Sequence, residues 1–269
     1  MSLELTLHTS PQVPVEAENI SPDKFAGLTI AEIETLSVMH GNEQLTLADF
    51  FKVEGQTGAE IHLQGDLSRL KYIGSGMSSG HIHIHGNTGQ HLGAAMSGGE
   101  ILVDGDAGDW VAPDMSGGRI QIKGNAGHMV GSAYRGSPVG IQGGEIIIHG
   151  DVRNEAGHCM RNGMIVVGGN SGDFTGVDML AGSIIVLGKL GIRSGAGMKR
   201  GSIVTLQAAA MLPTFSYACT YQPTYLRIYM QYLKESGLAI DEAHISGNYE
   251  RWCGDAIELN RGEILLYKD

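Results

Sequence analysis

One short unit recurs through the middle of this 269-residue chain. Each unit is an alternating strand, a Gly-Asn or Gly-Asp turn, a second glycine-rich stretch and an apolar residue placed three positions before a glycine. Successive strand starts are 21, 19, 19, 26, 19, 19 and 19 residues apart and fall at Glu60, His81, Glu100, Arg119, Glu145, Met164, Ser183 and Ser202. A period of this length predicts a solenoid, in which each unit buries its apolar face against the next.

The repeated unit predicts an all-β fold. Its second and fourth strand positions are Ile, Val or Leu, as in Ile101 and Val103, a period-2 pattern typical of a half-buried strand. The apolar anchors should pack inside the rod; they are Met77, Met96, Met115, Ile141, Met160, Met179 and Met198. Because the unit contains no helix-length segment, we expect a parallel β-helix of about seven coils, right-handed by the general crossover tendency.

The turns and the two ends of the chain complete the predicted architecture. Gly followed by Asp, as in Gly65-Asp66, favours positive φ at the glycine and a side chain bonded to nearby amides. We expect residues 1–58 to form a mixed N-terminal cap, residues 59–206 the β-helix, and residues 207–269 an aromatic-rich α+β C-terminal cap. A helix is predicted over 223–237 and a strand over 263–267.

Composition excludes several classes of partner. The net charge of −11, with no basic stripe, argues against nucleic acid. No apolar run approaches membrane length, and the N-terminus alternates like a strand instead of a signal peptide. Cys159, Cys219 and Cys253 form no disulfide framework and no metal-binding spacing. We therefore expect a cytoplasmic protein that contacts neither nucleic acid nor membrane.

The outward strand positions predict an interaction surface. They are polar in the early units, but the middle column becomes apolar in the later ones. A rod in water should not carry a continuous apolar stripe, so either the C-terminal helix or another subunit covers it. Seven extra residues at 132–138 predict a protruding loop with Tyr and Arg at its tip. The candidate subunit-interface residues are Ile147, Val166, Ile185, Val204, Tyr134, Arg135, Tyr225, Tyr229 and Tyr232.

Candidate chemistry is sparse. His81, His83 and His85 share one face of a strand, but the outer two would lie about 13 Å apart, too far for one zinc ion. His62 in the preceding unit lies near His83, which still leaves only two ligands, so we expect a histidine ladder and no metal site. The outward column also contains no Asp pair for general acid–base work. We predict no catalytic, cofactor-binding or metal-ligating residue in this chain.

The repeated coils resemble those of a known family. Their form, Gly-Asn-x-Gly-x-x-x-Gly-x-x-Met-x-x-Gly, resembles the GXGXG β-helix at the C-terminus of the glutamate synthase large chain. The C subunit of formylmethanofuran dehydrogenase, with its bacterial relative in the formyltransferase/hydrolase complex, is the more similar family. The segments that carry this resemblance are 14–18, 20–23, 132–140 and 197–203.

The resemblance implies a non-catalytic scaffold subunit of a cytoplasmic one-carbon complex. That complex handles formyl groups on methanofuran or an analogue. The partners implied are formyltransferase, amidohydrolase-like and molybdopterin-protein-like chains, which hold the carrier and the metals. The aromatic tail and acidic balance favour the formyltransferase/hydrolase version, which releases formate in formaldehyde oxidation.

Other assignments stay open from the sequence. One is the C subunit of a molybdenum or tungsten formylmethanofuran dehydrogenase, and another is a GXGXG scaffold tied to glutamate-synthase-like amide transfer. A carbohydrate-active β-helix enzyme is a third class, which the lack of paired carboxylates disfavours.

Overall fold

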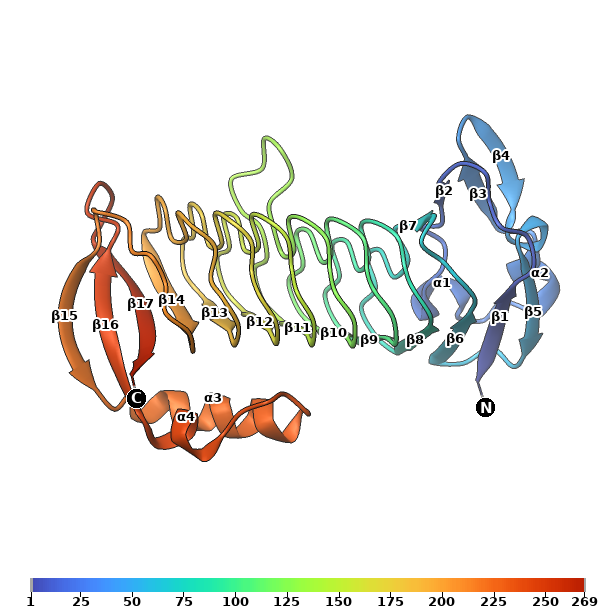
Figure 1. Ribbon diagram of the computed structural model, residues 1–269. Helices are drawn as coiled ribbons and strands as arrows, with labels where there is room; N and C mark the ends of the chain where they lie inside the picture. The colour runs from blue at the N-terminus through green and yellow to red at the C-terminus, as the bar shows by residue number, and fades with distance from the viewer. Residues whose placement is uncertain (1, 269) are drawn as a thin grey trace.

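Parallel stacking of the repeated strands organises the fold (Figure 1). The structure is a computed structural model that describes residues 2–268. Among these residues thirteen strands form one sheet, in the order β15-β16-β17-β14-β13-β12-β11-β10-β9-β8-β6-β1-β5. The repeated strands are β6 (Glu60–Gln64), β8 (His81–His85), β9 (Glu100–Val103), β10 (Arg119–Ile122), β11 (Glu145–Ile148), β12 (Met164–Val167), β13 (Ser183–Val186) and β14 (Arg200–Thr205).

Most of the remaining elements lie at the two ends of the rod, and one helix runs along its later coils (Figure 1). The first group is β1 (Leu3–Leu7), β2 (Val15–Glu16), α1 (Pro22–Phe25), α2 (Ile30–Glu34), β3 (Ser37–His40), β4 (Glu43–Thr46), η1 (Leu47–Asp49), β5 (Phe51–Gly55) and β7 (Leu70–Lys71). The second group is β15 (Ser216–Tyr221), α3 (Thr224–Glu235), α4 (Glu242–Ser246), β16 (Asn248–Gly254) and β17 (Arg261–Lys268). A smaller sheet has the order β4-β3-β2-β7.

The parallel register aligns equivalent side chains of successive repeats. Ile82 of β8 lies opposite Ile101 of β9, and Ile101 lies opposite Ile120 of β10. The interior columns are therefore continuous, and the core runs the length of the stack. All seven apolar anchors, from Met77 to Met198, are fully buried, which confirms their predicted packing role. The predicted all-β, β-helix-like fold with a large parallel sheet is confirmed at this level.

A ladder of Asn and Asp side chains connects the turns. Asn87 Oδ1 accepts a hydrogen bond from the backbone N–H of Asp106, and Asp106 Oδ1 accepts one from Asn125, at 2.9 and 2.6 Å. The pattern continues through Asn125, Asp151 and Asn170. These side chains satisfy backbone donors of the next coil, which confirms the predicted bonding to nearby amides.

The glycines before this ladder meet two different requirements. Gly65 has the predicted positive φ, 118°. Gly105 does not, and the expectation of positive φ is wrong there. A Cβ on Gly105 would lie 2.4 Å from Asn87 Oδ1, so the glycine admits the ladder side chain of the preceding coil.

Both ends of the stack are closed by strands that continue the sheet. β1 pairs with β6 in parallel and with β5 in antiparallel orientation. At the other end β17 adds in parallel to β14, and β16 and β15 follow in antiparallel orientation. The predicted C-terminal helix and final strand are α3 and β17, whereas β15, β16 and α4 were not expected from the sequence.

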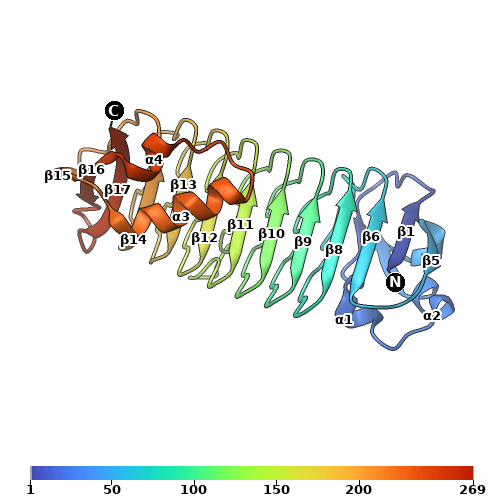
Figure 2. The same cartoon turned by 90° about the horizontal axis from the view of Figure 1, so that it is seen from below.

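Helix α3 lies across the later strands of the sheet, over β11 to β14 (Figure 2). The earlier strands, β6 to β10, are left open on the same side (Figure 2). Within residues 2–268 no helix has the length and apolar character needed to cross a membrane.

The packing between coils makes a prediction about Gly176. Its φ is +69°, and an added Cβ would lie 2.8 Å from Ile203 Cδ1, so Gly176→Ala combines backbone strain with overpacking. We expect a loss of about 2–4 kcal/mol in the free energy of unfolding, measured by urea denaturation.

Gly76→Ala is the matched control for this substitution. Its φ is +67° and nothing lies within 4 Å of an added Cβ. We expect a loss of about 1 kcal/mol, since only the strain remains. Equal losses in the two variants would contradict the overpacking explanation.

Candidate functional site

The outward face of the large sheet has two halves of different character. The strand register aligns one central column along it: His62, His83, Leu102, Gln121, Ile147, Val166, Ile185, Val204 and Leu265. The first four side chains are half-buried, and the last five are buried. The change occurs between β10 and β11, where the cover of α3 begins (Figure 2).

Helix α3 covers the apolar half. Leu226, Met230 and Leu233 form its inner face and are at most 3% exposed. They belong to one buried cluster with Ile147, Val166, Ile185 and Val204. The prediction that these four residues form a subunit interface is therefore corrected. The chain's own helix covers the stripe, because α3 presents apolar residues at helical spacing directly over the column.

Two tyrosines predicted as interface residues attach α3 to the sheet. Tyr232 Oη donates a hydrogen bond to Glu145 Oε2 at 2.6 Å, and Tyr225 Oη donates one to Glu263 Oε1 at 3.2 Å. Burial raises the pKa of the Tyr225 hydroxyl, which keeps it a donor. Tyr225, Tyr229 and Tyr232 are still 42%, 39% and 37% exposed. Contact of these rings with another chain stays a prediction.

The polar half carries a network of charges. Arg119 lies between Glu100 and Glu145, with N···O distances of 3.5 and 3.3 Å. Lys123 Nζ lies 2.6 Å from Asp104 Oδ1. The Glu145 side chain is only 16% exposed and also accepts a hydrogen bond from Tyr232, so Arg119 connects the open half to the edge of the part that α3 covers.

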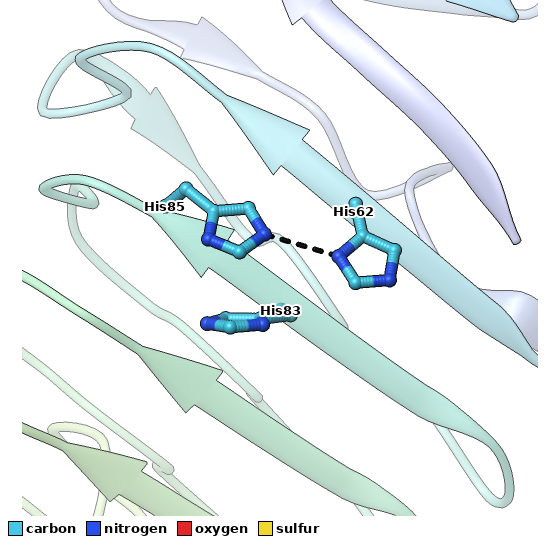
Figure 3. A group of neighbouring side chains, drawn as sticks. All are labelled: His62, His83 and His85. Carbon is cyan, nitrogen blue, oxygen red and sulfur yellow. Dashed lines mark hydrogen bonds between the residues drawn. The ribbon is translucent and has the colours of Figure 1, made fainter.

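Three histidines gather on this polar half, at the junction of β6 and β8 (Figure 3). One ring nitrogen each from His62, His83 and His85 lies within 4.8 Å of the others. His62 Nδ1 is 3.0 Å from His85 Nε2, and the rings of His83 and His85 have centroids 3.7 Å apart. His62 lies near His83 as expected, with ring centroids 5.7 Å apart, but its ring also stacks on His85 at 5.3 Å, so three histidines come together where two were expected.

Asp104 of the neighbouring loop holds two of these rings. Its Oδ2 lies 2.9 Å from His83 Nε2 and 3.0 Å from His85 Nδ1. Burial raises the pKa of Asp104, but hydrogen bonds from Lys123, His85 and His83 outweigh it and lower that pKa to about 2. Burial, with the neighbouring His85, lowers the pKa of His83 and favours its neutral imidazole.

The seven-residue insertion protrudes from the rod between β10 and β11, as predicted (Figure 1). Tyr134 turns back onto the chain: its hydroxyl is 2.8 Å from His91 Nδ1, and its ring stacks on Trp110 with centroids 5.0 Å apart. Arg135 is exposed. Of the two predicted docking residues, Arg135 is thus the one that faces solvent, and its contact with a partner stays a prediction.

Two further groups of polar side chains are poorly suited to catalysis. His158, Cys159 and Asp178 form a second cluster, but burial raises the pKa of the Cys159 thiol, the opposite of an activated nucleophile. An open groove of about 750 Å³ runs over the turns and includes Asp106 and Asp151. Both carboxylates accept hydrogen bonds from backbone N–H groups of the next coil, so their role is structural.

Comparison with known proteins identifies similar chains. The model of the GXGXG motif family matches residues 57–216. The C subunit of the tungsten-containing formylmethanofuran dehydrogenase 2 of Methanothermobacter wolfeii is 44% identical over 88 residues, covering 31% of this chain and 33% of that protein. The C subunit of the molybdenum-containing formylmethanofuran dehydrogenase 1 of Methanothermobacter thermautotrophicus is 48% identical over 80 residues, covering 29% and 20%. The match thus spans a third or less of these curated relatives.

A solved structure matches over the full length. It is a chain of the formyltransferase/hydrolase complex (FhcABCD) from Methylorubrum extorquens, crystallised in complex with methylofuran. The TM-score is 0.92 at 32% identity, and the match covers 99% of this chain and 100% of that chain. These findings confirm the resemblance drawn from the coil motif.

The buried stripe makes a prediction about Ile185. Ile185→Asp places an unpaired carboxylate beneath α3, and we expect the helix to detach in the isolated chain. Hydrogen exchange of residues 224–235 should accelerate at least tenfold. Leu102→Asp is the control, because it occupies the same column outside the helix and should leave that exchange unchanged. Slow exchange in Ile185→Asp would show that the helix is held elsewhere.

The half-buried position of His91, beside Tyr134, predicts that the stability of the fold depends on pH. Burial, then the charge of Lys71, lowers the pKa of His91 against the opposing effect of Glu16 and Asp109. The folded state therefore favours the neutral imidazole of His91. The stability that the neutral ring contributes is fully present above the pKa of an unfolded histidine, about 6.5, and is lost as the pH falls below that value.

We expect the urea concentration at the midpoint of unfolding to decrease as the pH is lowered from 7.5 to 5.5. The decrease should be smaller in His91→Gln. The exposed His81 gives the control variant His81→Gln, which should keep the dependence of the unsubstituted chain. An unchanged pH dependence in His91→Gln would contradict this assignment.

Proposed function

This chain belongs to the GXGXG motif family, and on that premise we propose that it is the scaffold subunit of a formyl-handling enzyme complex. In this proposal it corresponds to the C subunit, and other chains carry the catalytic groups. The complex acts on a formyl group held by methanofuran or an analogue. We propose the formyltransferase/hydrolase version, which releases formate.

The observation that carries this proposal is the full-length structural match. A β-helix core alone could occur beside many activities, since fold does not imply function. The match to the FhcABCD chain covers 99% of this chain and 100% of that chain, so it includes both ends as well as the repeats. The repeats are shared by many GXGXG proteins, whereas the two terminal segments are more specific to one kind of scaffold. Similarity in the terminal segments as well therefore favours a shared role for the two chains.

The C subunit of a dehydrogenase is the second candidate. It is supported by local identities of 44% and 48% to the tungsten and molybdenum enzymes. Those matches cover a third or less of the relatives, so most of the length of each relative is left unmatched. A GXGXG scaffold for glutamate-synthase-like amide transfer is a weaker alternative, because it rests on the coil motif alone.

The structure suggests how a scaffold role would work. The polar half of the outward face, from β6 to β10, carries Arg119, Glu100 and the histidine group and is not covered by α3 (Figure 2). The ring of Tyr232, which bonds Glu145 of the adjoining strand β11, is partly exposed, and so are Tyr229 and Tyr225 further along α3. Charge beside exposed aromatic rings is typical of protein interfaces. We propose that formyltransferase, amidohydrolase-like or molybdopterin-protein-like chains dock there.

The finer description of the scaffold belongs to the same proposal. We propose a right-handed β-helix of about seven coils over 59–206, capped by 1–58 and by 207–269. The carrier and the metals of the reaction would be held by partner chains in the cytoplasm.

Assembly tests the proposed function. We expect the tagged chain, coexpressed with the other three subunit types of an FhcABCD-like complex, to elute with them in fixed ratio. Formyl transfer from a pterin carrier to a methanofuran-type amine should need the whole assembly and be absent from this chain alone. Co-elution with glutamate-synthase-like chains, or a monomer under all conditions, would contradict the proposal.

A paired substitution locates the interface. Arg119→Glu reverses a charge on the open half, and we expect at least a tenfold loss in the yield of assembled complex. Arg153→Glu is the control, because Arg153 lies in the turn groove away from that face. Equal assembly in both variants would exclude the open half as the docking surface.

A further inference from the structure

The histidine group combines rings from two adjacent parallel strands. The register places His62 of β6 opposite His83 of β8, and His85 lies two residues further along the same face. Along β8 the backbone positions of His83 and His85 are about 7 Å apart, a distance that two imidazole side chains can bridge. The third ring, His62, comes from the neighbouring strand β6. The side chains are 25–29% exposed, so the group opens toward solvent.

Each ring has one nitrogen turned to a carboxylate. His62 Nε2 lies 3.2 Å from Glu60 Oε1. His83 Nε2 and His85 Nδ1 lie 2.9 and 3.0 Å from Asp104 Oδ2. A carboxylate favours an N–H on the nitrogen that it faces, which leaves the lone pair on the other nitrogen. The nitrogens left for a ligand are His62 Nδ1, His83 Nδ1 and His85 Nε2.

Two of these remaining nitrogens face each other closely. His62 Nδ1 and His85 Nε2 are 3.0 Å apart (Figure 3). With the protons on the carboxylate sides, two lone pairs would point at one another, which is unfavourable unless a proton or a metal ion lies between them. Nitrogens bound to one tetrahedral metal at about 2.1 Å would be separated by about 3.4 Å. This pair therefore needs only a small adjustment to coordinate one ion, and one nitrogen of His83 lies within 4.8 Å of a nitrogen of each of the other two rings.

The carboxylate of Asp104 is itself held in place. Its second oxygen, Oδ1, lies 2.6 Å from Lys123 Nζ. Oδ2 is thus directed at the two rings, and the positive charge of Lys123 balances the carboxylate. A carboxylate behind a histidine ligand is the usual second layer of a protein metal site.

We propose that His62, His83 and His85 bind one divalent transition-metal ion of the zinc(II) type, with Asp104 and Glu60 orienting the rings. Three neutral imidazoles suit Zn(II), Co(II), Ni(II) or Cu(II), and not Mg(II) or Ca(II), which prefer oxygen. The fourth position is open to water or to a side chain of another protein. This replaces the expectation of no metal in the chain, and it does not depend on the proposed function.

Metal titration of the full chain, freed of any affinity tag and stripped with EDTA, tests the proposal. We expect one equivalent of Zn(II) by calorimetry. With Co(II) we expect the visible absorption of a low-coordinate site. Mg(II) and Ca(II) should not compete at a hundredfold excess. His62→Gln, His83→Gln and His85→Gln should each weaken binding at least tenfold, and Asp104→Asn about 10–100-fold.

The control variant is His81→Gln. His81 belongs to the same strand and the same face, but it is exposed and pairs with Glu100. Its replacement should leave Zn(II) affinity unchanged. Circular dichroism checks that every variant folds. The unsubstituted chain gives an independent readout, since imidazole ¹⁵N resonances of three among the eleven histidines should shift with Zn(II).

Three results would overturn the proposal. One is no stoichiometric Zn(II) binding by the unsubstituted chain, which would leave a hydrogen-bonded histidine ladder. Another is unchanged affinity in a folded His83→Gln variant. The third is an equal loss in His81→Gln, which would indicate diffuse surface binding.

Discussion

The structure depends on backbone contact between successive coils in one fixed register. Each coil donates to the equivalent carbonyl of the preceding coil, as when the amide of Gly124 bonds to Gly105 at 3.1 Å. The approach is close because glycine occupies the turn: a Cβ at Gly124 would lie 2.2 Å from Asp106 Oδ1. Glycine content in this chain therefore reflects packing between coils, and the Asn/Asp ladder satisfies donors that the tight turn would otherwise leave unpaired.

A fixed register has consequences on the outside of the rod. Because equivalent positions align, a change in residue type along the sequence becomes a change of surface along the rod. The central column passes from His62 through Gln121 to Ile147, and α3 begins its cover at that change. The same register brings His62 beside the two histidines of β8. The same parallel register thus produces both the apolar column beneath α3 and the histidine group on β6 and β8.

Much of this arrangement could be predicted from the sequence, since the repeat determines strand, turn and anchor positions. The buried methionines, the ladder at Asp106 and the existence of helix α3 all follow from local patterns. The sequence did not show what covers Ile185. The apolar outward column indicates that something must pack on it, but not whether this is the chain's own helix or another subunit. The antiparallel β15 and β16 were missed because β15 is almost entirely exposed and β16 is largely half-buried, so neither strand alternates clearly.

The histidine group shows where reasoning along one strand fails. Measured along β8, His81 and His85 are too far apart for a common ligand. The relevant contacts run across strands, from His85 to His62 and from His85 to Asp104, and they depend on side-chain rotamers that spacing does not define. In a parallel stack every outward residue has neighbours about 4.8 Å away in the coils before and after it. Clusters of chemistry-bearing residues in such a fold should therefore be sought down the columns of the sheet as well as along each strand.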